Sequence, residues 1–77
     1  MNTQQHIAIL GSGNIGLSLA KGLVKAGIYK PEQITLTRRN VEALAQYTDE
    51  GYITTSNNSK AVKKADIIVI GIATTIE

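Results

Sequence analysis

The 77-residue sequence predicts an α/β fold with a doubly wound parallel sheet of about four strands, in the order βαβαβαβ. Two observations predict this class. Short runs of aliphatic and β-branched residues alternate along the chain with segments whose apolar residues recur at helical spacing. The first and last of these runs are apolar on both alternating faces, which is typical of parallel strands that helices cover on both sides.

The first strand and the first helix follow directly from this pattern. Residues 6–10 predict the strand, and Gly11 ends it. A helix is expected over residues 14–26, because apolar residues recur there at helical spacing and Gly27 suits a helix C-terminus. The apolar positions of this helix are Ile15, Leu19, Ala20, Leu23, Val24 and Ala26.

The middle of the chain predicts a second strand and a short helix. A turn at Pro31 and Glu32 precedes the strand, which is expected over residues 33–37 because its residues alternate and include β-branched types. Asn40 is a residue type that caps helices, and the apolar spacing after it predicts a short helix over residues 41–47.

The last third predicts one more crossover. A brief strand over residues 52–55 leads into a helix that ends near Lys64, with residues 56–58 as caps, Ala61 and Val62 directed inward and lysines directed outward. Residues 66–72 predict a buried parallel strand. Because complete sheets of this type hold five or six strands, we expect one unpaired edge and one thinly covered face.

Composition excludes several classes of function. A chain of 77 residues fits one small domain, and 43% hydrophobic with 18% charged residues is a globular composition. It has no cysteine and one histidine, so disulfides and zinc sites are not expected. The net charge of +2 comes without a long basic run, and no apolar stretch approaches membrane-spanning length. We therefore expect a cytoplasmic protein that binds neither nucleic acid nor membrane.

The turn after the first strand carries the main functional signal. It reads Gly11-Ser12-Gly13-Asn14-Ile15-Gly16, a G-x-G-x-x-G motif between a strand and a helix. The first glycine permits a tight turn, the second lets a pyrophosphate approach the backbone, and the third lets the helix pack close to the strand. Free N–H groups and the helix dipole would then bind the phosphates. The motif favours a Rossmann-like, NAD(P)-binding domain over a purely structural turn.

The segment after the second strand indicates which dinucleotide binds. An acidic residue there would bind the ribose hydroxyls of NAD, but the chain reads Thr37-Arg38-Arg39-Asn40. Guanidinium groups suit the 2′-phosphate of NADP, which they bind through paired, charge-assisted hydrogen bonds. The sequence therefore predicts NADP (NADPH) as cofactor, although arginines in such a loop can also be plain solvated charges.

Other candidates carry weaker signals. Asn58 could cap the third helix or contact the adenosine ribose, and spacing alone favours the cap. Gly71 and Ile72 end the last strand on the side where open α/β sheets bind ligands. His6 opens the first strand at the opposite edge, which favours a structural role. We identify no catalytic residue and no metal ligands in the chain.

Several segments together resemble the N-terminal domain of pyrroline-5-carboxylate reductases. They are residues 7–16, Ala20-Lys21-Gly22-Leu23, Lys30-Pro31-Glu32-Gln33-Ile34, Thr37-Arg38-Arg39-Asn40, and the block from Ala61-Val62 to Asp66-Ile67-Ile68. The resemblance covers nearly the whole chain, and related oxidoreductases of the 6-phosphogluconate dehydrogenase superfamily share parts of it.

This resemblance implies an enzyme that reduces 1-pyrroline-5-carboxylate to L-proline with hydride from a nicotinamide cofactor. It implies that residues 12–15 hold the pyrophosphate, 37–40 the ribose and its phosphate, and Asn58 the adenosine side. The family has Ala-Val-Lys-Pro along the nicotinamide where this chain reads Gly71-Ile72-Ala73-Thr74, so docking of that end is expected to differ. The family's helical C-terminal domain, which binds substrate and forms the dimer, is expected to lie outside residues 1–77.

Three functions stay open from the sequence. The first is the NADP-binding part of such an oxidoreductase, inactive in isolation. The second is a noncatalytic module that senses NAD(P)(H), since one fold serves unrelated functions. The third is a truncated domain that binds no nucleotide tightly and forms homo-oligomers through its exposed sheet edge.

Overall fold

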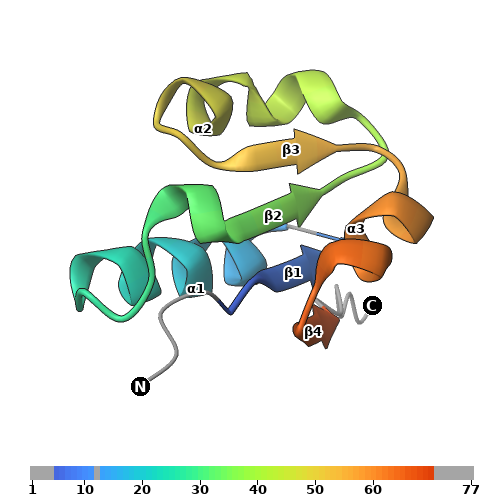
Figure 1. The fold of residues 1–77 in the computed structure, drawn as a ribbon. Coiled ribbons are helices and arrows are strands. Elements are labelled where there is room, and N and C mark those ends of the chain that lie inside the picture. The colour runs from blue at the N-terminus through green and yellow to red at the C-terminus, as the bar shows by residue number, and fades with distance from the viewer. Residues whose placement is uncertain (1–4, 12, 71–77) are drawn as a thin grey trace.

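The computed structural model describes residues 5–11 and 13–70 and confirms the α/β fold with a parallel sheet. The sheet has the order β3-β2-β1-β4 (Figure 1). Its strands are β1 (Ile7–Leu10), β2 (Ile34–Thr37), β3 (Ile53–Thr55) and β4 (Ile67–Ile70). The helices are α1 (Asn14–Lys25), α2 (Ala45–Asp49) and α3 (Asn58–Lys64), and two 3-10 helices span Pro31–Gln33 and Val41–Leu44.

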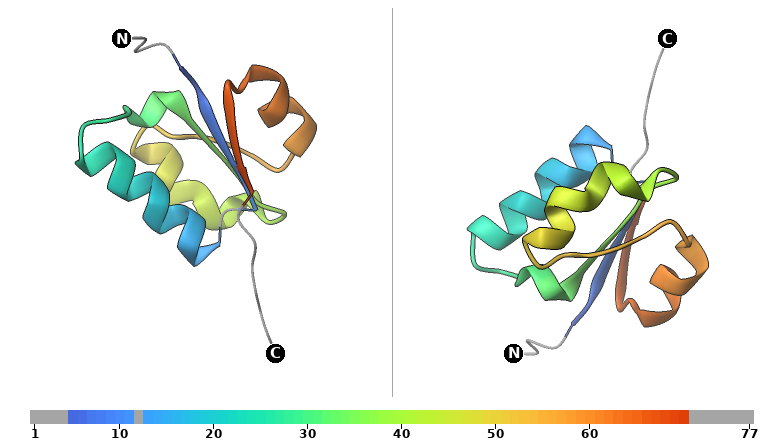
Figure 2. Two further views of the ribbon diagram at one scale, coloured as in Figure 1. Left: turned by 90° about the horizontal axis from the view of Figure 1, so that it is seen from below. Right: turned by 90° about the horizontal axis from the view of Figure 1, so that it is seen from above.

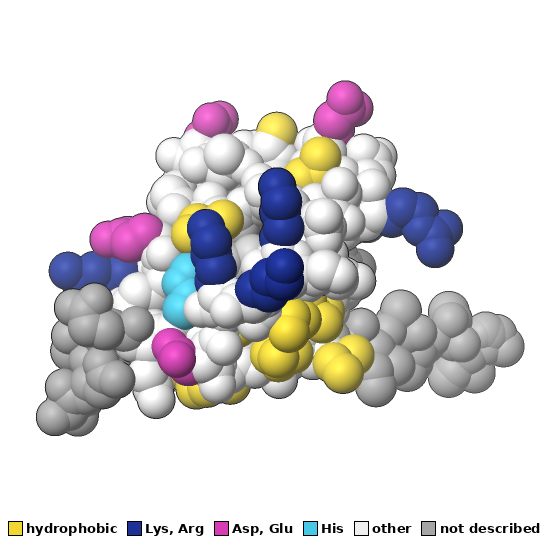
Figure 3. All heavy atoms as spheres, turned by 45° about the vertical axis from the view of Figure 1, so that its right-hand side comes forward, with side chains coloured by type: hydrophobic (Ala, Val, Ile, Leu, Met, Phe, Trp, Pro, Cys, Tyr) yellow, Lys and Arg dark blue, Asp and Glu magenta, His cyan; other side chains and the backbone are white. Residues whose placement is uncertain are grey.

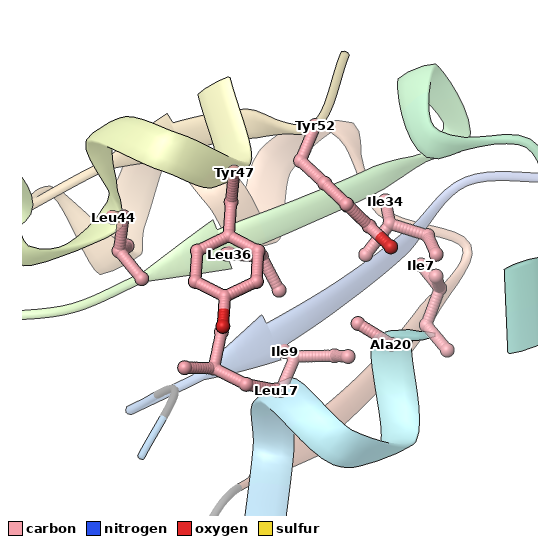
Figure 4. Packing of buried hydrophobic residues seen from close by; sticks show 9 residues of the cluster. All are labelled: Ile7, Ile9, Leu17, Ala20, Ile34, Leu36, Leu44, Tyr47 and Tyr52. Atoms are coloured by element: carbon pink, nitrogen blue, oxygen red, sulfur yellow. The ribbon is translucent and has the colours of Figure 1, made fainter. Parts of the chain in front are cut away.

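The helices cover the two faces of the sheet unequally. Figure 2 shows α1 and α2 on one face and α3 alone on the other. The strand register places Ile7 and Ile9 level with Ile34 and Leu36 on the α1 and α2 face, where the hydrophobic core lies. Side chains of the sheet, α1 and the region of α2 point toward one another there (Figure 4); the core residues are Ile7, Ile9, Leu17, Ala20, Ile34, Leu36, Leu44, Tyr47 and Tyr52.

Local signals explain where α1 begins and ends. Gly11 adopts the left-handed conformation with φ 68°, which ends β1 in a tight turn. Gly27, with φ 77°, follows the C-terminus of α1, where the N–H of Ile28 donates to the carbonyl of Leu23 at 3.0 Å. The predicted boundaries of this helix are therefore confirmed to within one residue.

The buried face of α1 differs from the set of apolar positions that predicted the helix. Ile15 and Leu19 are exposed, whereas Gly16, Leu17 and Ala20 are buried against the sheet. The absence of a side chain on Gly16 allows the helix to lie close to the sheet along that line of residues. Leu17, which was not among the predicted apolar positions, therefore lies in the core.

The expectation that the last strand is buried is wrong for the described chain. β4 pairs only with β1 and forms an edge of the sheet, so Ile67, Ile68 and Ile70 are exposed. Among the described helices, α3 alone covers the face of the sheet on which Ile68 lies (Figure 2). In α3, Ala61 is buried as predicted, but Val62 is exposed, although it was predicted to point inward. The predicted unpaired edge and thinly covered face are thereby confirmed for residues 5–11 and 13–70. Figure 3 shows exposed hydrophobic side chains next to a group of cationic ones.

His6 joins three strands at the amino edge of the sheet. Its Nε2 lies 2.6 Å from Thr35 Oγ1, and its backbone N–H donates to Asp66 Oδ2 at 2.8 Å. Desolvation lowers the pKa of His6, nearby Lys64 lowers it further, and Asp66 acts in the opposite direction. The imidazole lies far along β1 from the turn at Gly11, which agrees with a structural role.

Candidate dinucleotide-binding site

The candidate site lies at the carboxyl edge of the sheet. Because the strands are parallel, the residues that follow β1, β2 and β3 meet at this edge: Gly11, Arg38 and Ser56. Open α/β sheets bind ligands outside the carboxyl ends of their strands. The sequence-predicted phosphate and ribose segments are thus on the same side of the molecule.

The N-terminus of α1 forms the centre of the site. The N–H of Gly13 donates to the carbonyl of Gly11 at 2.8 Å, and the carbonyl of Gly13 accepts the first helical hydrogen bond, from Leu17 N–H at 2.9 Å. Gly13 is the N-cap, and no side-chain cap or acidic first-turn residue is found at this end within the described residues. The first-turn N–H groups and the positive end of the helix dipole are therefore available to an anion.

The surroundings of Gly13 leave room for a phosphate group. A Cβ built on Gly13 meets no atom within 4 Å, so the space beside this backbone is open. Asn14 is exposed, and Ile15 is 72% exposed although it is a large aliphatic side chain. A pyrophosphate needs an open, side-chain-free approach to a helix N-terminus, and the described residues fit that requirement. Ser12 lies outside the described residues, so its predicted role is untested.

Thr37 is enclosed by protein beside the glycine turn, and its predicted role toward the ribose and phosphate stays a prediction. Its side chain is only 1% exposed, and its Oγ1 accepts a hydrogen bond from the N–H of Gly11 at 3.0 Å. The hydroxyl thus contacts the glycine turn itself. Sequence reasoning placed both residues in the site but missed this bond, because no local pattern reports a partner 26 positions away.

The arginines after β2 are exposed at the edge of the site. Arg38 continues the ladder to β3 through its N–H, which donates to the carbonyl of Thr55 at 3.3 Å. Within the described part of the chain, no carboxylate forms an ion pair with Arg38 or Arg39. Asn40 caps the following 3-10 helix, as predicted, with its Oδ1 accepting from the N–H of Glu42 at 3.2 Å. Both guanidinium groups are therefore free to bind an anionic ligand.

The cap of α3 is Asn57 and not Asn58, which corrects the interpretation favoured by spacing. Asn57 Oδ1 accepts from the N–H of Lys60 at 3.1 Å, whereas Asn58 is the first helical residue and is exposed. Two consecutive asparagines give the same capping signal, so the sequence alone does not separate them. Asn58 lies three residues after the carboxyl end of β3, and its role toward adenosine stays a prediction. Gly71 and Ile72 lie outside the described residues.

In the part of the chain that the structure describes, no group of three or more His, Asp or Glu residues is arranged to hold a metal ion. None of the described helices is long and apolar enough to cross a membrane.

A glycine turn that joins a central parallel strand to a helix with a glycine N-cap defines the class of Rossmann-type dinucleotide-binding domains. Within this class, the chain belongs to the family described as NADP oxidoreductase, coenzyme F420-dependent, whose model matches residues 6–76. Membership of this family supports a nicotinamide nucleotide as the class of cofactor.

Individual relatives point in the same direction. Pyrroline-5-carboxylate reductase 2 of Dictyostelium discoideum is 47% identical over 73 residues, which are 94% of this chain and 24% of that protein. Pyrroline-5-carboxylate reductase of Corynebacterium melassecola is 34% identical over 65 residues, or 83% of this chain and 24% of that protein. The solved structure of a pyrroline-5-carboxylate reductase from Coxiella burnetii matches with a TM-score of 0.80 and 27% identity, over 90% of this chain and 26% of that chain. This chain therefore spans about a quarter of the length of these relatives.

Proposed function

We propose that this chain is the NADP-binding portion of an oxidoreductase that reduces 1-pyrroline-5-carboxylate to L-proline. The observation that carries the proposal is the N-terminus of α1, which shares one sheet edge with Arg38 and Arg39; among the described residues, no side chain caps this end of the helix and no carboxylate pairs with either arginine. The relatives named as pyrroline-5-carboxylate reductases support the substrate class. The groups that bind the substrate are proposed to come from a C-terminal helical domain, and the active protein from association of several copies.

We assign the described residues to the parts of the cofactor in order. First-turn N–H groups after Gly13 would hold the pyrophosphate, Arg38 and Arg39 the 2′-phosphate, and Asn58 the adenosine side. When bound, the reduced nicotinamide supplies the hydride, and the protein binds and orients it. Ser12, Gly71 and Ile72 are assigned to the same site on the sequence alone.

NADP is proposed over NAD because of charge at the end of β2. A carboxylate there would bind the ribose hydroxyls of NAD and repel a 2′-phosphate, but the nearest acidic residue after the strand is Glu42, in the 3-10 helix. Each charge-assisted hydrogen bond from a guanidinium to phosphate is worth roughly 1.5–3 kcal/mol. We therefore expect the 2′-phosphate to raise affinity by about tenfold or more.

The test is an NMR titration of the folded 77-residue chain with 2′,5′-ADP and, separately, with 5′-AMP. We expect tighter binding of 2′,5′-ADP, with shifts of the amides of Gly13 and Arg38. The double variant Arg38→Ala, Arg39→Ala should lose this preference and still bind 5′-AMP. The control variant Lys63→Ala, Lys64→Ala removes the same charge from the exposed face of α3 and should keep the preference.

Two results would contradict the proposal. If a chain shown to be folded bound neither nucleotide, the glycine motif would be structural and the truncated-domain interpretation would be preferred. If both double variants reduced the preference for 2′,5′-ADP equally, net charge and not a site at the end of β2 would be responsible.

A further inference from the structure

Thr37 is a polar residue almost fully enclosed by protein at the end of β2, directly before the arginine pair. Its side chain is 1% exposed, and its hydroxyl accepts a hydrogen bond from the N–H of Gly11 at 3.0 Å. We propose that Thr37 is a positioning residue that fixes the phosphate-binding turn and does not itself contact the nucleotide. This inference rests on the proposed function, because it concerns the same site.

The hydrogen bonds of Gly11 show how Thr37 acts on the turn. The N–H of Gly11 is held by Thr37 Oγ1, and its carbonyl accepts from the N–H of Gly13 at 2.8 Å. Gly11 therefore has a fixed peptide group on each side of its left-handed backbone conformation. The direction in which the chain leaves Gly11 sets where Gly13 and the first turn of α1 lie. Loss of the hydroxyl would remove the hydrogen bond that holds the N–H of Gly11.

The placement also explains why a hydroxyl is needed at this position. Valine has nearly the same shape as threonine, so a Thr37→Val variant would fill the same space. It would leave the amide of Gly11, whose bond to Thr37 is partly buried, without this acceptor, and a partly buried backbone N–H that loses its partner costs free energy. The turn would then relax toward conformations in which Gly11 finds water. Phosphate binding requires the original conformation, so affinity should fall by about three- to tenfold.

Thr35 provides a matched control on the same strand. It points to the same face of the sheet as Thr37, is 3% exposed, and its hydroxyl also has a partner, His6 Nε2 at 2.6 Å. That partner lies at the amino edge of the sheet, away from the glycine turn. Thr35→Val therefore removes an equivalent enclosed hydroxyl and its hydrogen bond, with no contact to the proposed site.

The experiment compares the wild-type chain with Thr37→Val, Thr37→Ser and Thr35→Val, each checked for folding by circular dichroism. The probes are 5′-AMP, whose phosphate would bind the turn, and 2′-AMP, whose phosphate would bind the arginines. Thr37→Val should lower the affinity for 5′-AMP by about three- to tenfold and leave the affinity for 2′-AMP within about twofold of the wild-type value. Thr37→Ser, which keeps the hydroxyl, should restore 5′-AMP binding. Thr35→Val should bind both probes as the wild type does.

A second readout does not depend on nucleotide. Amide hydrogen exchange of Gly11 should become faster in Thr37→Val and stay unchanged in Thr35→Val and Thr37→Ser. If the wild-type chain bound neither probe, the proposed function would fail, while this exchange would still test the positioning role. The inference itself is overturned if Thr37→Val weakens both probes equally, if it matches Thr35→Val in binding, or if exchange of Gly11 is unaltered.

Discussion

At the residue scale, Gly13 is a position where a substitution should affect nucleotide binding without affecting folding. Its φ of −88° is accessible to any residue, and a Cβ there meets no protein atom within 4 Å. Gly13→Ala should therefore leave the free energy of unfolding unchanged or raise it by up to about 1 kcal/mol, while a methyl group enters the space proposed for the pyrophosphate. Affinity for NADPH should fall at least tenfold in a fluorescence titration, whereas urea denaturation should show a stable fold.

Gly22→Ala is the control for that variant. Gly22 also has no atom within 4 Å of a built Cβ, but it lies in the middle of α1. Alanine there should raise stability by about 0.5–1 kcal/mol, because glycine is a poor helix former, and should not change NADPH binding. Equal affinities of the two alanine variants for NADPH would contradict the assignment of the pyrophosphate to Gly13.

The site residues differ in how far the sequence could predict them. The glycine turn was predictable because its chemistry depends on consecutive residues and on a strand and helix that flank it. The bond between Thr37 and Gly11 was not, since it depends on β1 and β2 being neighbours in register. The exposure of Arg38 and Arg39 could be expected for charged loop residues, but their freedom from carboxylates depends on the packing of more distant segments.

At the element scale, α3 tests the difference between a cap and a binding residue. Asn57 accepts from the N–H of Lys60, so Asn57→Ala should lower the free energy of unfolding by about 1 kcal/mol. Asn58 is the first helical residue and makes no such capping bond. Asn58→Ala should therefore lower the free energy of unfolding much less, but it should weaken the binding of 2′,5′-ADP. Urea denaturation and nucleotide titration of the two variants check this. Equal destabilisation by both would show that the cap is shared.

The same scale shows why burial was harder to predict than element type. Apolar spacing correctly predicted a helix at α1, but the residues buried against the sheet are Gly16, Leu17 and Ala20, and a glycine adds nothing to an apolar pattern. In α3, Ala61 is buried and its neighbour Val62 is exposed, and among the described helices α3 is alone on its face of the sheet (Figure 2). Periodicity predicts that a helix has an apolar face, but the elements that pack against the helix decide which residues are buried.

At the scale of the whole molecule, the order β3-β2-β1-β4 places the most apolar strand at an edge. In a doubly wound sheet of five or six strands this strand would have neighbours on both sides. The sequence of β4 has the composition of such a central strand, and its burial was predicted for that reason. The described chain instead exposes aliphatic side chains of β4 and of α3 on one face. Such an edge and face favour association with another polypeptide.

We therefore expect the 77-residue chain to self-associate through β4, and sedimentation velocity at increasing protein concentration measures this. Ile70 on β4 is 67% exposed, so Ile70→Lys should preserve folding, and a lysine on an edge strand opposes pairing with a second strand. Ile28, which is 63% exposed in the loop after α1, gives a control of similar exposure, and Ile28→Lys should associate like the wild type. A monomeric wild-type chain at all concentrations, or equal association of both variants, would exclude β4 as the interface.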